Sequence, residues 1–217
     1  MNPAPPVTAA RMGPYISRGM FITLEGIDGS GKTTQAELLA AWLRQEGRRV
    51  LTTREPGGTP VGEAVRHLVL HGDDVSPWAE AALFAAARAE HVESAIRPAL
   101  DRGDDVVCDR YLDSSVAYQG LARGLGEDAV RELNLTVTRN LLPVRTFLVL
   151  VAPVEARRRA SPQRDRIEQE DDEFMHRVDA AYRALARREP ARIVALDGER
   201  PAASIAEEIR EHLRALL

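Results

Sequence analysis

One glycine-rich segment near the N-terminus has the residue types and spacing needed to bind phosphate. It reads Gly26-Ile27-Asp28-Gly29-Ser30-Gly31-Lys32-Thr33 and fits the pattern G-x-x-x-x-G-K-[ST] at every fixed position. In this pattern the glycines let backbone N–H groups face an anion, the lysine reaches the β- and γ-phosphates, and the last hydroxyl can bind Mg²⁺. The segment therefore predicts a nucleoside triphosphate site, such as one for ATP, without saying which reaction follows.

The lysine of this segment is the only one in the chain. The sequence contains 29 lysine and arginine residues, and every one except Lys32 is an arginine. An ammonium group is compact whereas a guanidinium is broad and planar, so the two are not interchangeable in a tight site. We interpret Lys32 as a residue whose shape fits it to the transferring phosphates, where it would be catalytic.

The composition limits the classes of partner. A net charge of −4 gives no broad attraction to nucleic acid or to anionic lipid. The single cysteine, Cys108, excludes an internal disulfide and a metal site with several cysteines. No apolar run is long enough to span a membrane. We therefore expect a cytoplasmic protein that binds neither nucleic acid nor a membrane.

The chain divides into a short tail and one domain. Residues 1–19 contain four prolines, two arginines and no acidic residue, and they lack the apolar core of a secretory signal. We predict a disordered tail over 1–19 and a single domain over 20–217, with a small mobile lid at about 156–167.

Short apolar runs alternate with segments of helical periodicity. This alternation predicts an α/β fold in which a five-stranded parallel sheet has helices on both faces, as in the P-loop NTPase fold. The predicted strands are 20–25, 49–53, 105–108, 146–151 and 192–196. The predicted helices are 33–46, 61–70, 78–100, 113–121, 127–140, 154–160, 167–188 and 203–217.

Three polar segments follow three of these strands. They are the glycine-rich segment, Arg54-Glu55-Pro56-Gly57-Gly58 and Asp109-Arg110-Tyr111. Because ligands of parallel α/β sheets bind at the carboxyl ends of the strands, we expect the three segments to meet at one site.

The phosphate loop alone leaves two uses open, a phosphotransferase and a nucleotide-operated switch. A GTP switch needs an Asn-Lys-x-Asp segment, and a chain with one lysine has none. Asp109 is followed by Arg110, Tyr111 and Leu112, so the Asp-x-x-Gly of such switches is missing too. A kinase is favoured, while a kinase with another nucleoside or nucleotide acceptor and a non-catalytic ATP-binding protein remain alternatives.

Four motifs together resemble the thymidylate kinases, a family of P-loop nucleoside monophosphate kinases. They are 21–34, which contains the phosphate loop, Arg54-Glu55-Pro56-Gly57-Gly58-Thr59, Leu83-Phe84 followed by Arg88, and 109–120, which reads D-R-Y-x-x-S-x-x-A-Y-Q-G. The resemblance runs from about residue 20 to 217. It implies transfer of the γ-phosphoryl group of ATP to dTMP, giving dTDP and ADP for dTTP biosynthesis, with Mg²⁺ and in a homodimer.

The resemblance also implies how the acceptor nucleoside is recognised. Phe84 would stack on thymine and Arg88 would donate to an exocyclic oxygen of the base. Ser115 and Gln119 would reach the base edge, and Tyr118 would crowd the 2′ position of the sugar.

The same resemblance assigns the charged residues near the phosphates. Arg54 and Arg110 would hold the acceptor monophosphate, and Arg110 would also be catalytic. Asp28 would contact the sugar 3′-hydroxyl or the metal shell. Asp109 would be catalytic and, with Thr33, would hold Mg²⁺, partly through water.

Some family members carry a catalytic arginine within the phosphate loop, where this chain has Gly29 or Ser30. Other members place it in the lid, and this lid is rich in arginine. We therefore predict that Arg164, or alternatively Arg159 or Arg166, closes over the transferring phosphoryl group.

The sequence departs from the family in one respect. Many members have an acidic residue near the end of the fourth strand, about where this chain has Val151. Asp197-Gly198, after the fifth predicted strand, is placed to line the adenine pocket.

Overall fold

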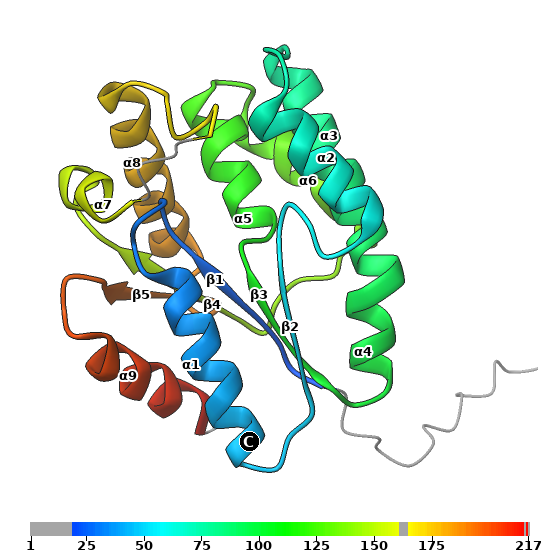
Figure 1. Ribbon diagram of the computed structural model, residues 1–217, viewed down its shortest axis with the longest axis vertical. Coiled ribbons are helices and arrows are strands. Elements are labelled where there is room, and N and C mark those ends of the chain that lie inside the picture. The colour runs from blue at the N-terminus through cyan, green and yellow to red at the C-terminus, as the bar shows by residue number, and fades with distance from the viewer. Residues whose placement is uncertain (1–18, 161–164, 215, 217) are drawn as a thin grey trace, which may run out of the picture.

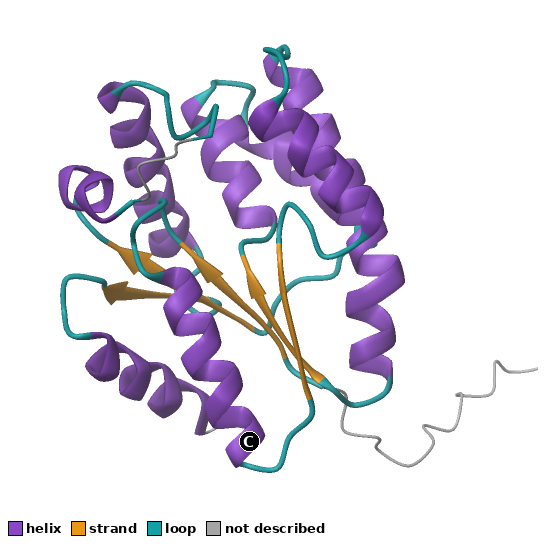
Figure 2. Ribbon diagram, in the orientation of Figure 1, coloured by secondary structure: helices purple, strands orange, loops and turns teal. Residues whose placement is uncertain are grey.

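A parallel sheet forms the centre of the molecule. The computed structural model describes residues 19–160, 165–214 and 216, so the tail predicted for 1–19 lies outside the described residues except for Gly19. The strand order is β2-β3-β1-β4-β5 and all neighbours are parallel, which confirms the predicted fold class (Figures 1 and 2). The strands are β1 (Phe21–Glu25), β2 (Val50–Arg54), β3 (Asp105–Asp109), β4 (Arg145–Leu150) and β5 (Ile193–Asp197).

Helices connect the strands and cover both faces of the sheet (Figure 1). Two of the helical segments, η1 and η2, have the wider turns of a π-helix. The segments are α1 (Lys32–Gln45), α2 (Pro60–His71), α3 (Pro77–His91), η1 (Val92–Ile96), α4 (Arg97–Asp101), α5 (Leu112–Ser115), η2 (Val116–Ala122), α6 (Glu127–Val137), α7 (Pro153–Arg159), α8 (Asp172–Arg188) and α9 (Ala202–Arg214).

Alternating strand residues feed two separate cores. On β1, Ile22 and Leu24 pack with α1 and α9, whereas Phe21 belongs to the core on the other face, with α3, η2 and α8. The two-residue period of a strand explains the division, because successive side chains point to opposite faces. Both faces are therefore buried, as the apolar sequences of parallel strands require.

Two predicted helix boundaries were wrong, and a third predicted helix changes its turn width. The last helix before β5 begins at Asp172 and not at residue 167, because Asp171 caps it by accepting from the N–H of Phe174 at 2.7 Å. The helix predicted for 127–140 ends at Val137, and Arg139 and Asn140 then take positive φ angles. The run predicted for 78–100 is helical throughout, but η1 widens it in the middle.

The register brings the polar segments to one edge of the sheet. Asp109, the last residue of β3, is aligned with Leu24 on one side and with Arg54 on the other. The three segments that follow β1, β2 and β3 therefore start at the same level. Within the described part of the chain, no helix is both long and apolar enough to cross a lipid bilayer.

Candidate active site

Two cations share one carboxylate at the carboxyl edge of the sheet. The Nζ of Lys32 and the Nη2 of Arg110 each lie 2.8 Å from Oδ1 of Asp28. Burial alone would raise the pKa of Asp28, but the charges of Arg110 and Lys32 outweigh that effect and hold the pKa well below its usual range. Asp28 is therefore a carboxylate that joins the phosphate loop to the segment after β3.

The backbone at Arg110 is strained in a way that aims its side chain at Asp28. Its φ angle is 70°, in the left-handed region that residues other than glycine seldom adopt. The N–H of Arg110 donates to the carbonyl oxygen of Leu24 at 2.9 Å, which fixes this turn against β1. The guanidinium also donates to Ser114 at 3.1 Å and to the hydroxyl of Tyr182 at 3.2 Å.

Thr33 and Asp109 form a second contact between the two segments. The hydroxyl of Thr33 donates to Oδ2 of Asp109 at 2.5 Å. The other carboxylate oxygen, Oδ1, is buried and has no hydrogen-bond partner among the described residues. A hydroxyl beside a carboxylate with a free oxygen is the oxygen donor set that Mg²⁺ prefers, so these residues fit the predicted metal.

A hollow next to this edge contains most of the predicted acceptor residues. Its walls come from the ends of β1 to β3 and from α2, α3, α5, η2 and the turn before α8. The lining includes Asp28, Phe84, Arg88, Arg110, Ser115, Tyr118 and Gln119. Arg54 is not among the described residues that line it. The Arg54 side chain is 56% exposed and pairs with Glu63 at 3.1 Å.

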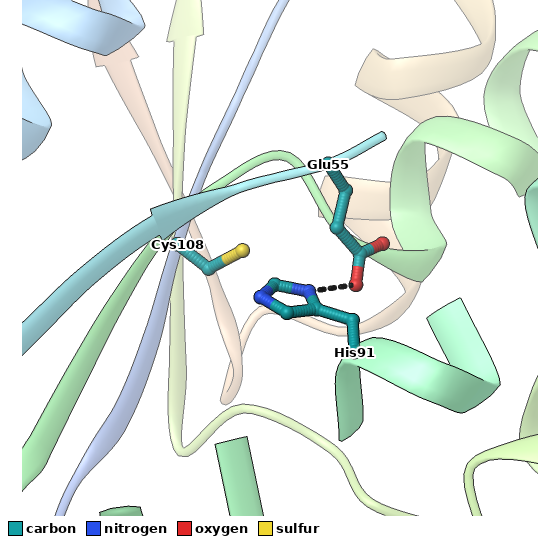
Figure 3. A group of neighbouring side chains, drawn as sticks. All are labelled: Glu55, His91 and Cys108. Atoms are coloured by element: carbon teal, nitrogen blue, oxygen red, sulfur yellow. Dashed lines mark hydrogen bonds and ion pairs between the residues drawn. The ribbon is translucent and has the colours of Figure 1, made fainter. Parts of the chain in front are cut away.

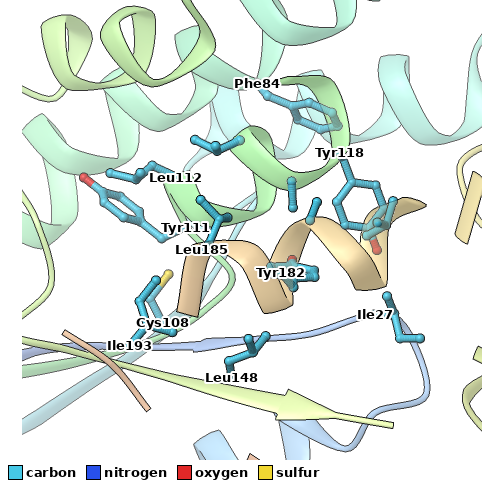
Figure 4. Packing of buried hydrophobic residues seen from close by; sticks show 14 of the residues in the cluster. Ile27, Phe84, Cys108, Tyr111, Leu112, Tyr118, Leu148, Tyr182, Leu185 and Ile193 are labelled. Atoms are coloured by element: carbon cyan, nitrogen blue, oxygen red, sulfur yellow. The ribbon is translucent and has the colours of Figure 1, made fainter. Parts of the chain in front are cut away.

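Aromatic side chains form the apolar wall of this hollow. Phe84 from α3 and Tyr118 from η2 are both nearly buried. The ring of Tyr118 meets that of Tyr182 from α8 edge to face, with centroids 6.2 Å apart (Figure 4). The guanidinium carbon of Arg110 lies 5.4 Å from the Tyr118 ring centroid, which places a cation over an aromatic face.

Protein acceptors engage four of the five N–H groups of the Arg88 guanidinium, and Arg88 also lines the hollow. Its Nε donates to Glu55 at 2.6 Å, and Nη1 donates to Ser115 at 3.0 Å and also to Asn134. Its Nη2 donates to the carbonyl oxygen of Tyr111 at 3.1 Å. Four separate elements thus determine the orientation of this guanidinium, and Ser115 is brought to it rather than to open solvent.

Glu80 anchors the turn before α8 to α3. This buried carboxylate accepts from Gln119 at 2.9 Å, from Arg123 at 2.7 Å and from Arg166 at 2.5 Å. Burial would raise the pKa of Glu80, but its hydrogen bonds to Arg123 and Arg166 lower it below its ordinary value. Arg166 is therefore held beside the acceptor hollow and does not line the space above the phosphate loop.

A second hollow lies above the phosphate loop. Its lining includes Gly29, Gly31, Lys32, Thr33 and Arg159.

Arg159 lies at the end of α7, on the rim of that hollow. Its Nε donates to Glu155 at 2.7 Å and its Nη1 donates to the carbonyl oxygen of Gly198 at 2.9 Å. Arg164, the other predicted lid arginine, lies outside the described residues. Arg159 is thus the predicted lid arginine that the described part of the chain places near the phosphate loop.

The packing around Gly29 leaves no room for an arginine at this position of the phosphate loop. Its φ angle is +83°, and a β-carbon there would lie 2.1 Å from the carbonyl oxygen of Ala156. Because α7 packs directly on the loop, any side chain at position 29 would collide with backbone.

Val151 occupies a packed position. It is 2% exposed, and a β-carbon at Gly198 would lie 2.6 Å from one of its methyl groups. The position where the family often has an acid is thus filled here by an apolar contact between the segments after β4 and β5.

Sequence reasoning missed two buried glutamates, Glu25 and Glu55. Glu25 accepts from Tyr111 N–H at 2.8 Å, from Ser114 Oγ at 2.6 Å and from Tyr182 Oη at 3.0 Å. Burial, with a smaller contribution from the charge of Asp113, raises the pKa of Glu25 to about 7. A signal existed, since Glu25 is the charged last residue of the strand predicted for 20–25 and Glu55 lies two residues after the strand predicted for 49–53.

The comparisons with known proteins agree with one another. Residues 24–209 match the family model described as thymidylate kinase. Thymidylate kinases of Leifsonia xyli and Thermomicrobium roseum are 54% and 51% identical; the alignments cover 88% and 87% of this chain and 93% and 91% of those proteins. A crystal structure of thymidylate kinase from Ehrlichia chaffeensis superposes with a TM-score of 0.75 at 34% identity, covering 90% of this chain and 99% of that one.

Proposed function

The chain belongs to the thymidylate kinase family, and from that premise we infer that it is a dTMP kinase. It transfers the γ-phosphoryl group of ATP to dTMP, giving dTDP and ADP in dTTP biosynthesis. The observation that carries this inference is the position of Asp28, which binds Lys32 of the phosphate loop and Arg110 of the acceptor hollow at the same carboxylate oxygen. Two phosphate-binding cations are thereby held side by side, as transfer between two phosphates requires.

On the donor side, the phosphate loop and the N-terminus of α1 bind the triphosphate of ATP. Backbone N–H groups and the positive end of the helix dipole face the phosphates, and Lys32 neutralises charge on the group in transit. Thr33 and Asp109 would hold Mg²⁺, Asp109 partly through water. Bound Mg²⁺ would neutralise charge on the phosphate oxygens.

On the acceptor side, Arg110 binds the monophosphate of dTMP and holds it in line with the donor. The incoming phosphates compete with Asp28 for Arg110 and Lys32, which leaves Asp28 free to accept from the sugar 3′-hydroxyl. Arg54 joins Arg110 on the same phosphate after it leaves Glu63. No covalent enzyme intermediate is needed, because positioning and charge neutralisation supply the catalysis.

The base is recognised by the side chains that line the hollow. Phe84 stacks on thymine, Arg88 and Gln119 donate to its polar edge, and Tyr118 fills the space of a 2′-hydroxyl. The packing of Phe84 and Tyr118 around the hollow supports this proposal.

A lid arginine completes the site in our proposal. Its position on the rim of the donor hollow supports Arg159. Arg164 is the other candidate and lies outside the described residues. Action in the cytoplasm and assembly as a homodimer are further proposals, and both rest on the family resemblance.

An ADP-release assay with dTMP, dUMP, dGMP, dCMP and thymidine tests the proposed function. We expect turnover with dTMP to exceed that with every other acceptor. Turnover with thymidine but not dTMP would indicate a nucleoside kinase. ATP binding without turnover on any acceptor would indicate a non-catalytic protein.

A further inference from the structure

Glu55, His91 and Cys108 form a buried cluster (Figure 3), and Glu55 of this cluster also lines the acceptor hollow. Their side chains come from the end of β2, the end of α3 and β3, and their donor atoms all lie within 4.8 Å of one another. Three such groups invite the idea of a metal site. The positive charge of Arg88, 2.6 Å from the Glu55 carboxylate, opposes a second cation there.

The thiol of this cluster is also unsuited to a metal. The Cys108 thiol is 3.0 Å from the carbonyl oxygen of Arg110 and donates to it. Burial, together with the nearby charge of Glu55, raises the pKa of Cys108 well above its ordinary value, so the thiolate that a metal needs is disfavoured.

The remaining contacts form a chain of hydrogen bonds that ends at Arg88. Thr53 Oγ1 lies 2.7 Å from His91 Nε2, and His91 Nδ1 lies 2.9 Å from Glu55 Oε1. Glu55 Oε2 then accepts from Arg88 Nε at 2.6 Å. Because a carboxylate paired with arginine only accepts, the proton in the His91–Glu55 bond is on Nδ1; when the imidazole is neutral, the Thr53 hydroxyl donates to Nε2.

The ring of His91 also supports the loop after β2. A β-carbon at Gly58 would lie 2.5 Å from His91 Nε2 and 2.6 Å from the Thr53 hydroxyl, so the loop backbone rests directly on this hydrogen bond. The same loop carries Glu55 and Pro56, and both line the acceptor hollow. His91 therefore packs against the loop after β2, and Glu55 of the same loop binds Arg88.

The position of His91 on α3 connects these hydrogen bonds to the residues proposed to recognise the base. Phe84, Arg88 and His91 are spaced four and three residues apart, so they lie along one face of the helix. Arginine has a long side chain that loses much rotamer freedom when it is fixed. The Glu55 carboxylate on Nε is the one charged acceptor among the four described acceptors that hold this guanidinium, and His91 in turn holds that carboxylate.

We propose that His91 is a positioning residue for acceptor recognition: by holding Glu55, it fixes the guanidinium of Arg88 at the base-binding wall of the hollow. The inference rests on the proposed function, because it takes the base to be the thymine of dTMP. His91 itself does not line the hollow among the described residues, so it acts through Glu55.

Steady-state kinetics of His91→Ala test the proposal. We expect the KM for dTMP to rise about ten- to a hundredfold, since an oriented charge-assisted hydrogen bond is lost. The KM for ATP should stay within about twofold. The ratio of kcat/KM for dTMP to that for dCMP should fall about tenfold, because we assign the guanidinium to O4 of thymine, where cytosine has an amino group.

Two further variants separate positioning from packing. His91→Asn keeps an N–H near the place of Nδ1 and should recover most of the dTMP affinity. Thr53→Val keeps the shape of threonine, removes the bond to Nε2, and should raise the KM for dTMP about two- to fivefold. Ile209→Ala, in the core on the opposite face of the sheet, is the control that lowers the Tm without changing either KM.

The outcomes separate this inference from the function on which it rests. If the wild-type protein does not phosphorylate dTMP, the proposed function and this inference both fail. If it does, and His91→Ala keeps its KM for dTMP and its base discrimination, the inference alone is overturned. Histidine ¹⁵N spectra of the wild type add a check that needs no substitution. A proton on Nε2 rather than Nδ1 of His91 would contradict the proposed hydrogen bond from His91 to Glu55.

Discussion

The two hollows of this molecule are built in different ways. The donor hollow, about 420 Å³, is formed mainly by the phosphate loop and the first turn of α1, with Arg159 and Glu168 at its rim. The acceptor hollow, about 90 Å³, is enclosed by side chains from many elements. In our proposal, local backbone therefore binds the triphosphate, whereas side chains that long-range packing has already oriented bind the base.

The charges follow the same division. Lys32 has an acceptor four residues away, Asp28, that a phosphate can replace. Arg88 instead has a buried partner 33 residues away, Glu55, whose loss would leave a guanidinium uncompensated at a cost of about 3–5 kcal/mol. The donor side is therefore built for exchange of partners and the acceptor side for fixed orientation.

The largest effect that we predict is on the donor side. Lys32→Arg should reduce kcat at least about a hundredfold, because a guanidinium cannot take the place of the compact ammonium among the phosphates. Thermal unfolding should show a folded protein, and Arg44→Lys on the exposed face of α1 is the matched control. Near-normal turnover of Lys32→Arg would contradict our interpretation of the lone lysine.

The second prediction concerns Glu25, the buried last residue of β1, which bonds to Ser114 and Tyr182. The pKa of Glu25 is about 7 in the folded state and 4.5 ordinarily. Between these two pH values the folded protein keeps a proton on Glu25 that the unfolded chain has released. The stabilisation from this group is therefore complete below pH 4.5 and lost as the pH rises to about 7, by up to about 3 kcal/mol.

Urea unfolding of wild type and Glu25→Gln between pH 4.5 and 8 measures this effect. The free energy of unfolding should fall more steeply with pH for the wild type, because glutamine does not titrate. Parallel curves would show that Glu25 does not bind the proton. Asp28, whose pKa is lowered, contributes in a separate window, since its stabilisation is lost only in more acidic solution.

The third prediction is that two arginines of the lid region affect different kinetic constants. Arg159→Ala should lower kcat about ten- to a hundredfold, as expected for a lost charge near the transferring group. Arg166→Ala should instead act mainly on the KM for dTMP, because Arg166 holds Glu80 beside the acceptor hollow. Single-turnover and steady-state kinetics separate the two, and the reverse pattern would invalidate the division between the hollows.

The smallest effect is expected at Arg54. Its side chain is more than half exposed and pairs with Glu63, so it must change partner to reach dTMP. Arg54→Ala should raise the KM for dTMP about fivefold, while Glu63→Ala should lower it slightly by freeing the arginine. Steady-state kinetics with dTMP as the varied substrate measure both. Equal KM values for the two variants would mean that Arg54 stays a surface residue.

Much of the fold followed from the sequence because its signals are local. Apolar runs of strand length and helical periodicity gave five strands in their correct places, and the alternation of strands with helices gave the parallel sheet. The errors arose at helix ends. The cap at Asp171 and the turn at Arg139 and Asn140 depend on single side chains and backbone angles that periodicity does not contain.

The sequence by itself also determined the family and predicted the donor side. The phosphate loop binds with backbone N–H groups whose geometry a short run of residues dictates, so its pattern can be recognised without a structure. Only the tertiary structure decided that Glu55 pairs with both Arg88 and His91, that Arg166 pairs with Glu80, and that Asp28 joins Lys32 to Arg110. The physical reason is distance along the chain: a buried charge must be neutralised by whatever lies beside it in space, and packing rather than sequence spacing selects that neighbour.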